Sequence, residues 1–230
     1  MMIGVVHLPG RRTAVAGVLL FMVASCTDGR RPTSAPGTGA KDTAPAAGDR
    51  AERDARRPVV DPDRLIRADG IAHAAAGMTI GDLRAGLPSG VTLGRARPYM
   101  VDIAAMPVVA DGDTLYLILI PSGEPSHDDA RINLVAITDT TFRTMEGIGP
   151  GSTLADATRA YGAPTLSYST YDESREYATF PDLHRDIRLR VLPPSDTAAF
   201  AGIYETSGEY NETRQYDPSA RIGMVIVYTR

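Results

Sequence analysis

The chain has 230 residues, of which 43% are hydrophobic and 23% charged, and its formal net charge is −4. This is the composition of an ordinary globular protein with room for one or two domains. Because nucleic-acid binding needs a concentrated basic face, the acidic balance argues against a nucleic-acid partner.

The N-terminus has the pattern of an export signal. Arg11 and Arg12 precede an apolar run at residues 14–24, which is shorter than the ~20 residues that a membrane-spanning helix needs. The run ends in Val-Ala-Ser-Cys at residues 23–26, which resembles the lipobox of bacterial lipoproteins. This resemblance implies that residues 1–25 are a signal peptide and that Cys26 is acylated, becoming the mature N-terminus. Cys26 is also the only cysteine, so we expect no internal disulfide.

Residues 26–60 are predicted to be a disordered tether. Between Thr27 and Pro58 there is no Val, Leu, Ile, Met or aromatic residue, so the segment cannot bury enough apolar area to offset its ordering entropy. A flexible coil of this length spans roughly 30–35 Å. Without residues 1–25 the chain carries 22 basic and 28 acidic residues, a net charge of −6, so we expect lipid rather than charge to provide the anchor.

Residues 61–230 are predicted to form the globular domain, whose first half covers residues 65–138. The small residues at 72–76 have helix propensity, and Thr79-Ile80-Gly81-Asp82 fits a capping box that starts a helix ending near Ala85. Strands are expected at 91–97, 99–104, 107–110, 114–120 and 131–138. Because both faces of residues 114–120 are apolar, we expect this strand to lie centrally in its sheet.

The second half, residues 142–228, repeats the plan. Ser152 or Thr153 caps a helix that runs to about Tyr161, and strands are expected at 166–170, 176–180, 186–191 and 221–228. Residues 192–219 have no counterpart in the first half. We therefore interpret them as an insertion without a regular element, either a functional loop or a mobile flap.

Three landmarks recur in the same order in both halves. An acidic residue followed by Gly-Ile occurs at 69–71 and 146–148, a Gly-x-Thr-apolar-x-Asp helix start at 77–82 and 151–156, and Ala-Arg-Ile at 130–132 and 220–222. The pattern resembles the small lipoprotein of the outer-membrane β-barrel assembly machinery, and its tandem form resembles β-lactamase inhibitor proteins. The fold class expected from this is α+β, with two tandem repeats, each of short helices packed on an antiparallel sheet of three to four strands.

Few residues have the spacing of a catalytic or metal-binding site. His127, beside Asp128 and Asp129, is one candidate base, and His184 is another, although no nucleophile motif accompanies either. No pair of His or Cys residues has metal-ligand spacing, so no metal or cofactor is expected. The glycines at 147–151 are interpreted as part of a helix cap rather than a phosphate loop, because no P-loop lysine follows.

Tyrosines are concentrated in the second half, many of them beside polar residues. Tyrosine is favoured at interfaces because it combines a large contact area with a polar tip. The alternative is that the rings cover sheet faces in a chain without tryptophan. The candidate partner-binding residues are Tyr168, Tyr171, Tyr204, Tyr210 and Tyr216.

Three functions fit these observations. The first is a lipid-anchored binding or scaffolding protein of the cell envelope, facing the periplasm or the cell surface, with the outer membrane favoured over the inner. Its partners are the membrane, through acylated Cys26, and an envelope protein. The second is an envelope hydrolase that uses His127 or His184 with nearby acids. The third is a sensor of a small ligand or peptide. Because no catalytic constellation is present, we expect a binding protein rather than an enzyme.

Overall fold

The computed structural model describes residues 59–71, 73–124, 126–205 and 207–229. The signal peptide, Cys26 and all of the tether up to Pro58 lie outside these residues, and so does Ala72. Among the described helices, none is long and apolar enough to cross a membrane.

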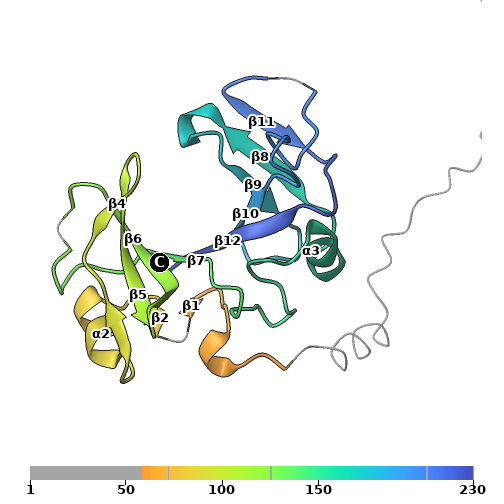
Figure 1. The fold of residues 1–230 in the computed structure, drawn as a ribbon. Helices are drawn as coiled ribbons and strands as arrows, with labels where there is room; N and C mark the ends of the chain where they lie inside the picture. The colour runs from red at the N-terminus through yellow and green to blue at the C-terminus, as the bar shows by residue number, and fades with distance from the viewer. Residues whose placement is uncertain (1–58, 72, 125, 206, 230) are drawn as a thin grey trace, which may run out of the picture. The chain divides into compact units, whose positions relative to one another are not determined.

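Most strands of the described chain join one antiparallel sheet of ten strands (Figure 1). The strand order is β11-β8-β9-β10-β12-β7-β6-β5-β3, and β4 also pairs with β5. A separate sheet of two strands is formed by β1 (Gly70–Ile71) and β2 (Ala74–Ala75). The strands of the large sheet are β3 (Val91–Leu93), β4 (Arg97–Met100), β5 (Ile103–Ala110), β6 (Asp113–Pro121), β7 (Leu134–Ile137), β8 (Thr165–Ser169), β9 (Glu176–Thr179), β10 (Ile187–Leu192), β11 (Tyr210–Thr213) and β12 (Arg221–Tyr228).

The expected α+β fold of two tandem repeats, each with short helices on its own sheet of three to four strands, is wrong. The described residues form a mostly β structure, in which the only two α-helices are α2 (Ile80–Gly86) and α3 (Leu154–Tyr161). The strands from both halves belong to a single sheet because β7 pairs directly with β12, with Val225 opposite Ile137. Both strands are apolar on both faces, which suits them to the middle of a sheet and not to an edge.

Each α-helix begins at the predicted capping box. The Thr79 hydroxyl accepts a hydrogen bond from the Asp82 N–H, and the Asp82 carboxylate accepts one from the Thr79 N–H. Thr153 and Asp156 make the same reciprocal pair at α3. Glycine then ends α3, since Gly162 adopts a positive φ of 84° beyond its last turn.

The Ala-Arg-Ile segments contact these helix starts. The Arg131 guanidinium donates to the carbonyl of Gly77, and the Arg221 guanidinium donates to that of Gly151. The first helical N–H of α3, on Leu154, donates to the Ala220 carbonyl at 2.8 Å. The recurring sequence therefore has a local role, which is to satisfy backbone groups that a helix start leaves without internal partners.

The main core lies on the face of the large sheet that carries both helices. Ile80 and Leu83 from α2 and Leu154 and Ala157 from α3 are completely buried in it. They pack with the inward side chains of the strands, including those of β6, β7, β10 and β12. The other face of the sheet carries a second, smaller apolar cluster.

Most predicted strands form within a few residues of the expected bounds, and three local predictions are wrong. The strand expected at 99–104 contains the turn between β4 and β5, and residues 107–110 belong to the same strand as residues 103–106. Residues 74–75 form β2 instead of part of a helix, because Ala74 and Ala75 pair with Ile71 and Gly70. The insertion contains a regular element, because β11 pairs with β8 along its full length. The central position predicted for residues 114–120 is confirmed, since β6 lies between β5 and β7.

Candidate functional site

The face of the large sheet opposite both helices is the candidate binding site. We name it the helix-free face, since in the described chain no helical residue belongs to its apolar cluster. Its core is buried, and partly exposed side chains surround that core. The cluster consists of Ala105, Leu119, Ala136, Tyr177, Met224 and Ile226, with Ile103, Leu117, Leu134 and Tyr228 partly exposed around them.

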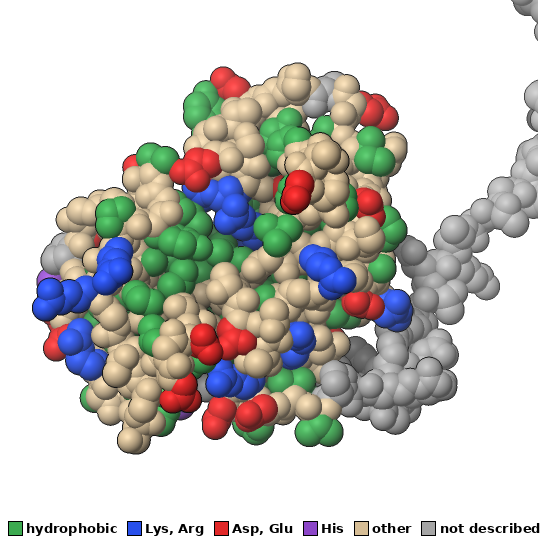
Figure 2. All heavy atoms as spheres, viewed as in Figure 1, with side chains coloured by type: hydrophobic (Ala, Val, Ile, Leu, Met, Phe, Trp, Pro, Cys, Tyr) green, Lys and Arg blue, Asp and Glu red, His purple; other side chains and the backbone are tan. Residues whose placement is uncertain are grey.

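Strand alternation places these residues. In β6, Tyr116, Ile118 and Ile120 point into the main core, so Leu117 and Leu119 point to the helix-free face. Because β6 is apolar on both faces, it contributes side chains both to the main core and to the cluster of the helix-free face. Hydrophobic side chains gather on the surface shown in Figure 2, over the region where β5, β6 and β7 lie in Figure 1.

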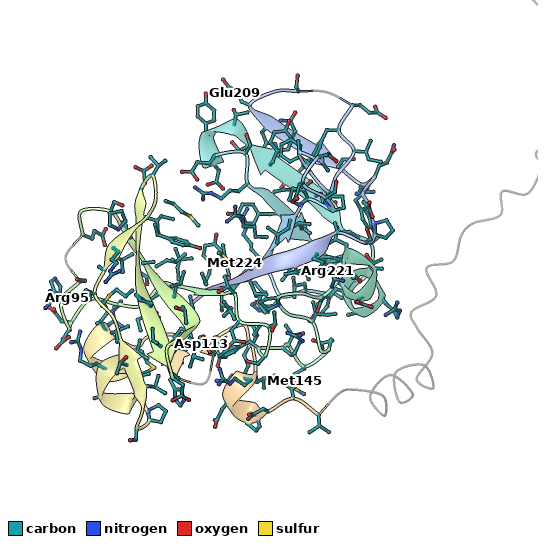
Figure 3. The ribbon with its side chains drawn as sticks, viewed as in Figure 1. Arg95, Asp113, Met145, Glu209, Arg221 and Met224 are labelled. Atoms are coloured by element: carbon teal, nitrogen blue, oxygen red, sulfur yellow. The ribbon has the colours of Figure 1, made fainter. Side chains whose placement is uncertain are left out.

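A β-bulge at Gly223 directs Met224 to this face. In the register of β10 with β12, Val191 lies opposite Ile222 and Arg190 lies opposite Met224, which leaves Gly223 as an extra residue. In a regular strand Ile222 and Met224, which are two residues apart, would share a face; because of the bulge, Ile222 enters the main core and Met224 the helix-free face. Figure 3 labels Met224 near the middle of the sheet.

Arginines lie beside the apolar cluster. Ile187, Leu189 and Val191 of β10 enter the main core, so Arg188 and Arg190 project from the helix-free face, opposite Ile226 and Met224. The Arg188 guanidinium carbon is 5.2 Å from the centre of the Tyr177 ring, a cation–π distance. On the other side of the cluster, Arg97 of β4 lies opposite Ala105.

A surface hollow of about 820 Å³ adjoins Arg188. It is lined by Arg185, Asp186, Arg188 and Tyr228. Asp186 also lies 3.6 Å from the Nδ1 of His184. The hollow therefore has charged side chains of both signs and one aromatic ring.

One hydrogen bond links the β4–β5 turn to the turn after β8. The Val101 N–H donates to the Glu173 carboxylate at 3.3 Å, although 72 residues separate them. Arg175 holds Glu173 in place, with its guanidinium 2.8 Å from that carboxylate and 2.7 Å from that of Asp172. The hydrogen bond from Arg175 lowers the pKa of Glu173, so the carboxylate is ionised at neutral pH.

A buried carboxylate binds the insertion, residues 192–219, to the face of the sheet that lies opposite the helix-free face. Glu176 is 4% exposed and accepts hydrogen bonds from the Ala201 N–H, the Gly202 N–H and the Tyr204 hydroxyl, at 2.7–2.8 Å. The Tyr168 ring stacks on Phe200 with centroids 4.1 Å apart and meets Tyr204 edge-on. This segment is therefore a packed part of the domain.

The five candidate tyrosines fall into two groups. Tyr168 is buried, Tyr204 is bonded to Glu176, and the Tyr216 hydroxyl is 2.8 Å from that of Thr158 on α3. Tyr171 and Tyr210 are 78% and 63% exposed. The structure therefore gives the first three internal contacts and leaves only the last two free to meet a partner.

Tyr171 and Tyr210 lie at the same end of the sheet, near the outermost strand. Tyr171 belongs to the short 3-10 helix η2 (Thr170–Asp172), which directly follows β8, and Tyr210 begins β11. Each of the two hydroxyls has a hydrogen bond to a carboxylate. The bond to Glu209, which Figure 3 labels, raises the pKa of Tyr171, and the bond to Glu212 raises the pKa of Tyr210.

The two histidine candidates lie in different loops, His127 between β6 and β7 and His184 between β9 and β10. The His127 imidazole contacts the Asp129 carboxylate, and the side chain of His127 is 52% exposed. His184 is similarly exposed and accepts a hydrogen bond from the Asp186 N–H. Within the described residues, no group of three or more His, Cys, Asp or Glu side chains could hold a metal ion.

The residues that sequence reasoning missed are the arginines and the apolar cluster of the helix-free face. The alternation of apolar residues with arginine in Ile187-Arg188-Leu189-Arg190 was the available signal for Arg188 and Arg190. Gly223 inside an apolar strand was the signal for the bulge.

Comparisons with known proteins give no assignment. No family model and no curated protein matches the chain. Among solved structures, the chain is similar to the uncharacterized protein yfeY from Escherichia coli, with a TM-score of 0.45 and 10% sequence identity, covering 71% of this chain and 99% of that chain. At that level of similarity no argument about function follows.

Proposed function

We propose that the protein is a lipid-anchored binding protein of the bacterial cell envelope and that it holds a protein partner on the helix-free face. The observation that carries the proposal is the apolar cluster on a sheet face to which neither α-helix contributes. Leu117 and Leu134, which adjoin the buried part of the cluster, are partly exposed although both lie in central strands. An apolar patch with a polar rim on a folded domain is typical of a protein–protein interface.

The composition of this face fits a protein partner. It combines leucine, methionine and tyrosine with arginine, and aromatic residues, Met and Arg are enriched at the centres of interfaces. Figure 2 shows Arg side chains next to the hydrophobic ones on this surface. The histidines with neighbouring acids, by contrast, are exposed, and neither has a third catalytic group in contact among the residues that the structure describes.

Site-specific photo-crosslinking in living cells tests the proposal. A photoreactive residue in place of Leu117 or Leu134 should give a discrete protein adduct. The matched control replaces Arg159, whose side chain is 75% exposed on α3, and should give no such adduct. The same adducts from all three positions, or none from the two leucine positions, would refute docking at this face.

The anchor is tested separately because it depends on the lipobox resemblance alone. The mature protein should begin at acylated Cys26 and partition with membranes. Cys26→Ser should leave the chain uncleaved or release it from the membrane fraction. An unmodified mature chain beginning at another residue would refute the anchor and leave the docking face unaffected.

A further inference from the structure

Charge distinguishes the helix-free face from the rest of this acidic protein. Three arginines project from it: Arg97 on one side of the apolar cluster and Arg188 and Arg190 on the other. Across the part of the chain that the structure describes, none of the three has a carboxylate within 4.0 Å or a hydrogen bond from its guanidinium. Arg175 and Arg159 do have such partners, and the other described arginines without one are Arg95, Arg185 and Arg214.

The carboxylates near this face have other partners. Glu173 is bound by Arg175, Glu212 accepts a hydrogen bond from the Tyr210 hydroxyl at 2.6 Å, and Asp186 lies beside His184. None of these carboxylates lies within 4.0 Å of Arg97, Arg188 or Arg190, although Glu173 and Arg190 attract each other at longer range. A partner carboxylate could bind there without displacing an existing ion pair, so the docking surface favours an anionic group.

The guanidinium groups are also held in position. Arg190 is half-buried between Tyr177 and Met224, its neighbours on the two adjoining strands. Arg188 lies over the Tyr177 ring, which orients its plane while its N–H groups stay available. A planar guanidinium with free N–H groups binds a carboxylate through two parallel hydrogen bonds. Such pre-orientation reduces the entropy that binding would otherwise cost.

The width of the face indicates the kind of occupant. Arg97 on β4 and Arg188 on β10 are separated by β5, β6, β7 and β12, which at ~4.8 Å per strand amounts to at most about 24 Å along the sheet. The hydrogen bond between Val101 and Glu173 shows that the two sides of the sheet also curve toward each other. An extended polypeptide at ~3.3 Å per residue covers that width with about seven residues. The hollow beside Arg188 is lined by three charged side chains and one tyrosine, so it lacks the mostly apolar lining that a small amphiphile would need.

We propose that the partner presents an acidic, aliphatic polypeptide segment, whose carboxylates bind Arg188, Arg190 and Arg97 while its aliphatic side chains lie on the partly exposed leucines between them, Leu117 and Leu134. The inference rests on the proposed function, because it names the chemistry of the partner for the same face. It adds a prediction that docking alone does not make, which is that binding depends on the sign of the partner's charge.

Two peptide libraries displayed on phage serve as probes against the full mature chain in detergent. Both contain linear peptides of about twelve residues, enough at ~3.3 Å per residue to cross the face, with identical Leu and Val positions. The remaining positions are Asp, Glu and Ser in one library and Lys, Arg and Ser in the other. Only the acidic library should yield binders, and their affinity should fall as ionic strength rises.

Charge variants locate these binders. The double variant R188E/R190E should weaken a selected acidic peptide by about tenfold or more, as is typical when an interfacial charge pair is lost. The neutral R188Q/R190Q should weaken it less, and R95E should change nothing, because Arg95 is an exposed arginine that Figure 3 shows at the outer end of the sheet. Peptides from the basic library should gain binding to R188E/R190E, which would show that the reversed variant is folded.

Two results would overturn the inference, and they differ in what they mean for docking. If both libraries yield binders that L117Q weakens and R188E/R190E does not, the face is a docking site without charge selection. If no binder from either library responds to L117Q or to R188E/R190E, the docking face itself is also refuted.

Discussion

At the scale of single residues, the main core contains one polar atom that the fold does not satisfy. Tyr116 is 1% exposed and meets the Phe142 ring edge-on, and its hydroxyl has no hydrogen-bond partner among the described residues. Burial raises the pKa of this hydroxyl, because the phenolate would be still harder to bury. The buried Tyr116 ring therefore stabilises the folded protein, whereas burial of its unbonded hydroxyl destabilises it.

Tyr116→Phe should consequently increase the free energy of unfolding, by about 1 kcal/mol, since it removes a buried unpaired hydroxyl and keeps the ring. Urea denaturation measures the change. Tyr161→Phe is the matched control, because the buried Tyr161 hydroxyl contacts the Thr144 hydroxyl and donates to the Glu146 carboxylate at 2.9 Å. The control should lose about 1 kcal/mol. Equal losses in both variants would contradict the assignment of Tyr116 as unsatisfied.

At the scale of elements, acid should weaken the start of α3. The Thr153 hydroxyl, and then Arg159, lower the pKa of Asp156 below its usual value. A carboxyl whose pKa is lowered on folding contributes stability above its unfolded pKa of about 3.9, and that contribution is lost as pH falls through the folded value. Asp156→Asn should therefore lower the melting temperature at pH 7, with an effect of ~1 kcal/mol or less.

The difference in melting temperature between the wild-type protein and Asp156→Asn should then shrink as the pH is lowered below about 4. Thermal scans at several pH values measure it. Arg84→Gln, at an exposed ion pair in the last turn of α2, serves as a control whose effect should be small throughout. A difference that grows on acidification would have the wrong sign for this cap.

The insertion gives a second prediction at this scale. Tyr204→Ala and Tyr216→Ala should each lower the melting temperature by several degrees, because Tyr204 is bonded to buried Glu176 and Tyr216 to Thr158. Tyr210→Ala should leave it nearly unchanged, since that ring is 63% exposed. Differential scanning fluorimetry distinguishes the two groups. If all three variants melt like the wild type, the insertion is not fastened to the sheet as described.

Helices and strands could be predicted where the residues that determine them are close together in the sequence. The sequence signals for the Thr79 and Thr153 caps and for the apolar strand at 221–228 each lie within a few consecutive residues. All three elements form as predicted. β11 was missed because Tyr210-Asn211-Glu212-Thr213 has little apolar character and becomes a strand only by pairing with β8. The fold class failed for the same reason, since the pairing of β7 with β12 has no local sequence signal.

The candidate site was predicted in part. The sequence identified five candidate tyrosines but not which of them are exposed. The packing in the structure shows that Tyr168, Tyr204 and Tyr216 make internal contacts. The helix-free face depends on which side of a strand is covered, and this follows from the position of the helices rather than from the strand's own residues. The arginine alternation in β10 and the glycine in β12 were readable, but their meaning required the register between the two strands.

At the scale of the whole domain, the pairing of β7 with β12 makes the two halves one folding unit. Ala136 and Ile226 lie opposite each other on the helix-free face, and Ile137 and Val225 do so in the main core. Separating the strands would expose apolar side chains on both faces together with the hydrogen-bonding edges of two central strands. Such edges are prone to aggregate.

Residues 59–138 and 142–230 expressed separately should therefore be insoluble or lack a cooperative unfolding transition, whereas the intact domain should unfold in one transition. The control is a protease site inserted between Thr140 and Thr141, which are exposed on the connection after β7. Cleavage there cuts the chain but spares every strand pairing, so the nicked protein should stay together and keep its circular dichroism spectrum. Size-exclusion chromatography and thermal melts measure both outcomes. A first half that folds alone with its own sharp transition would show that the central pairing joins two independent sheets, and the single-unit account would then be wrong.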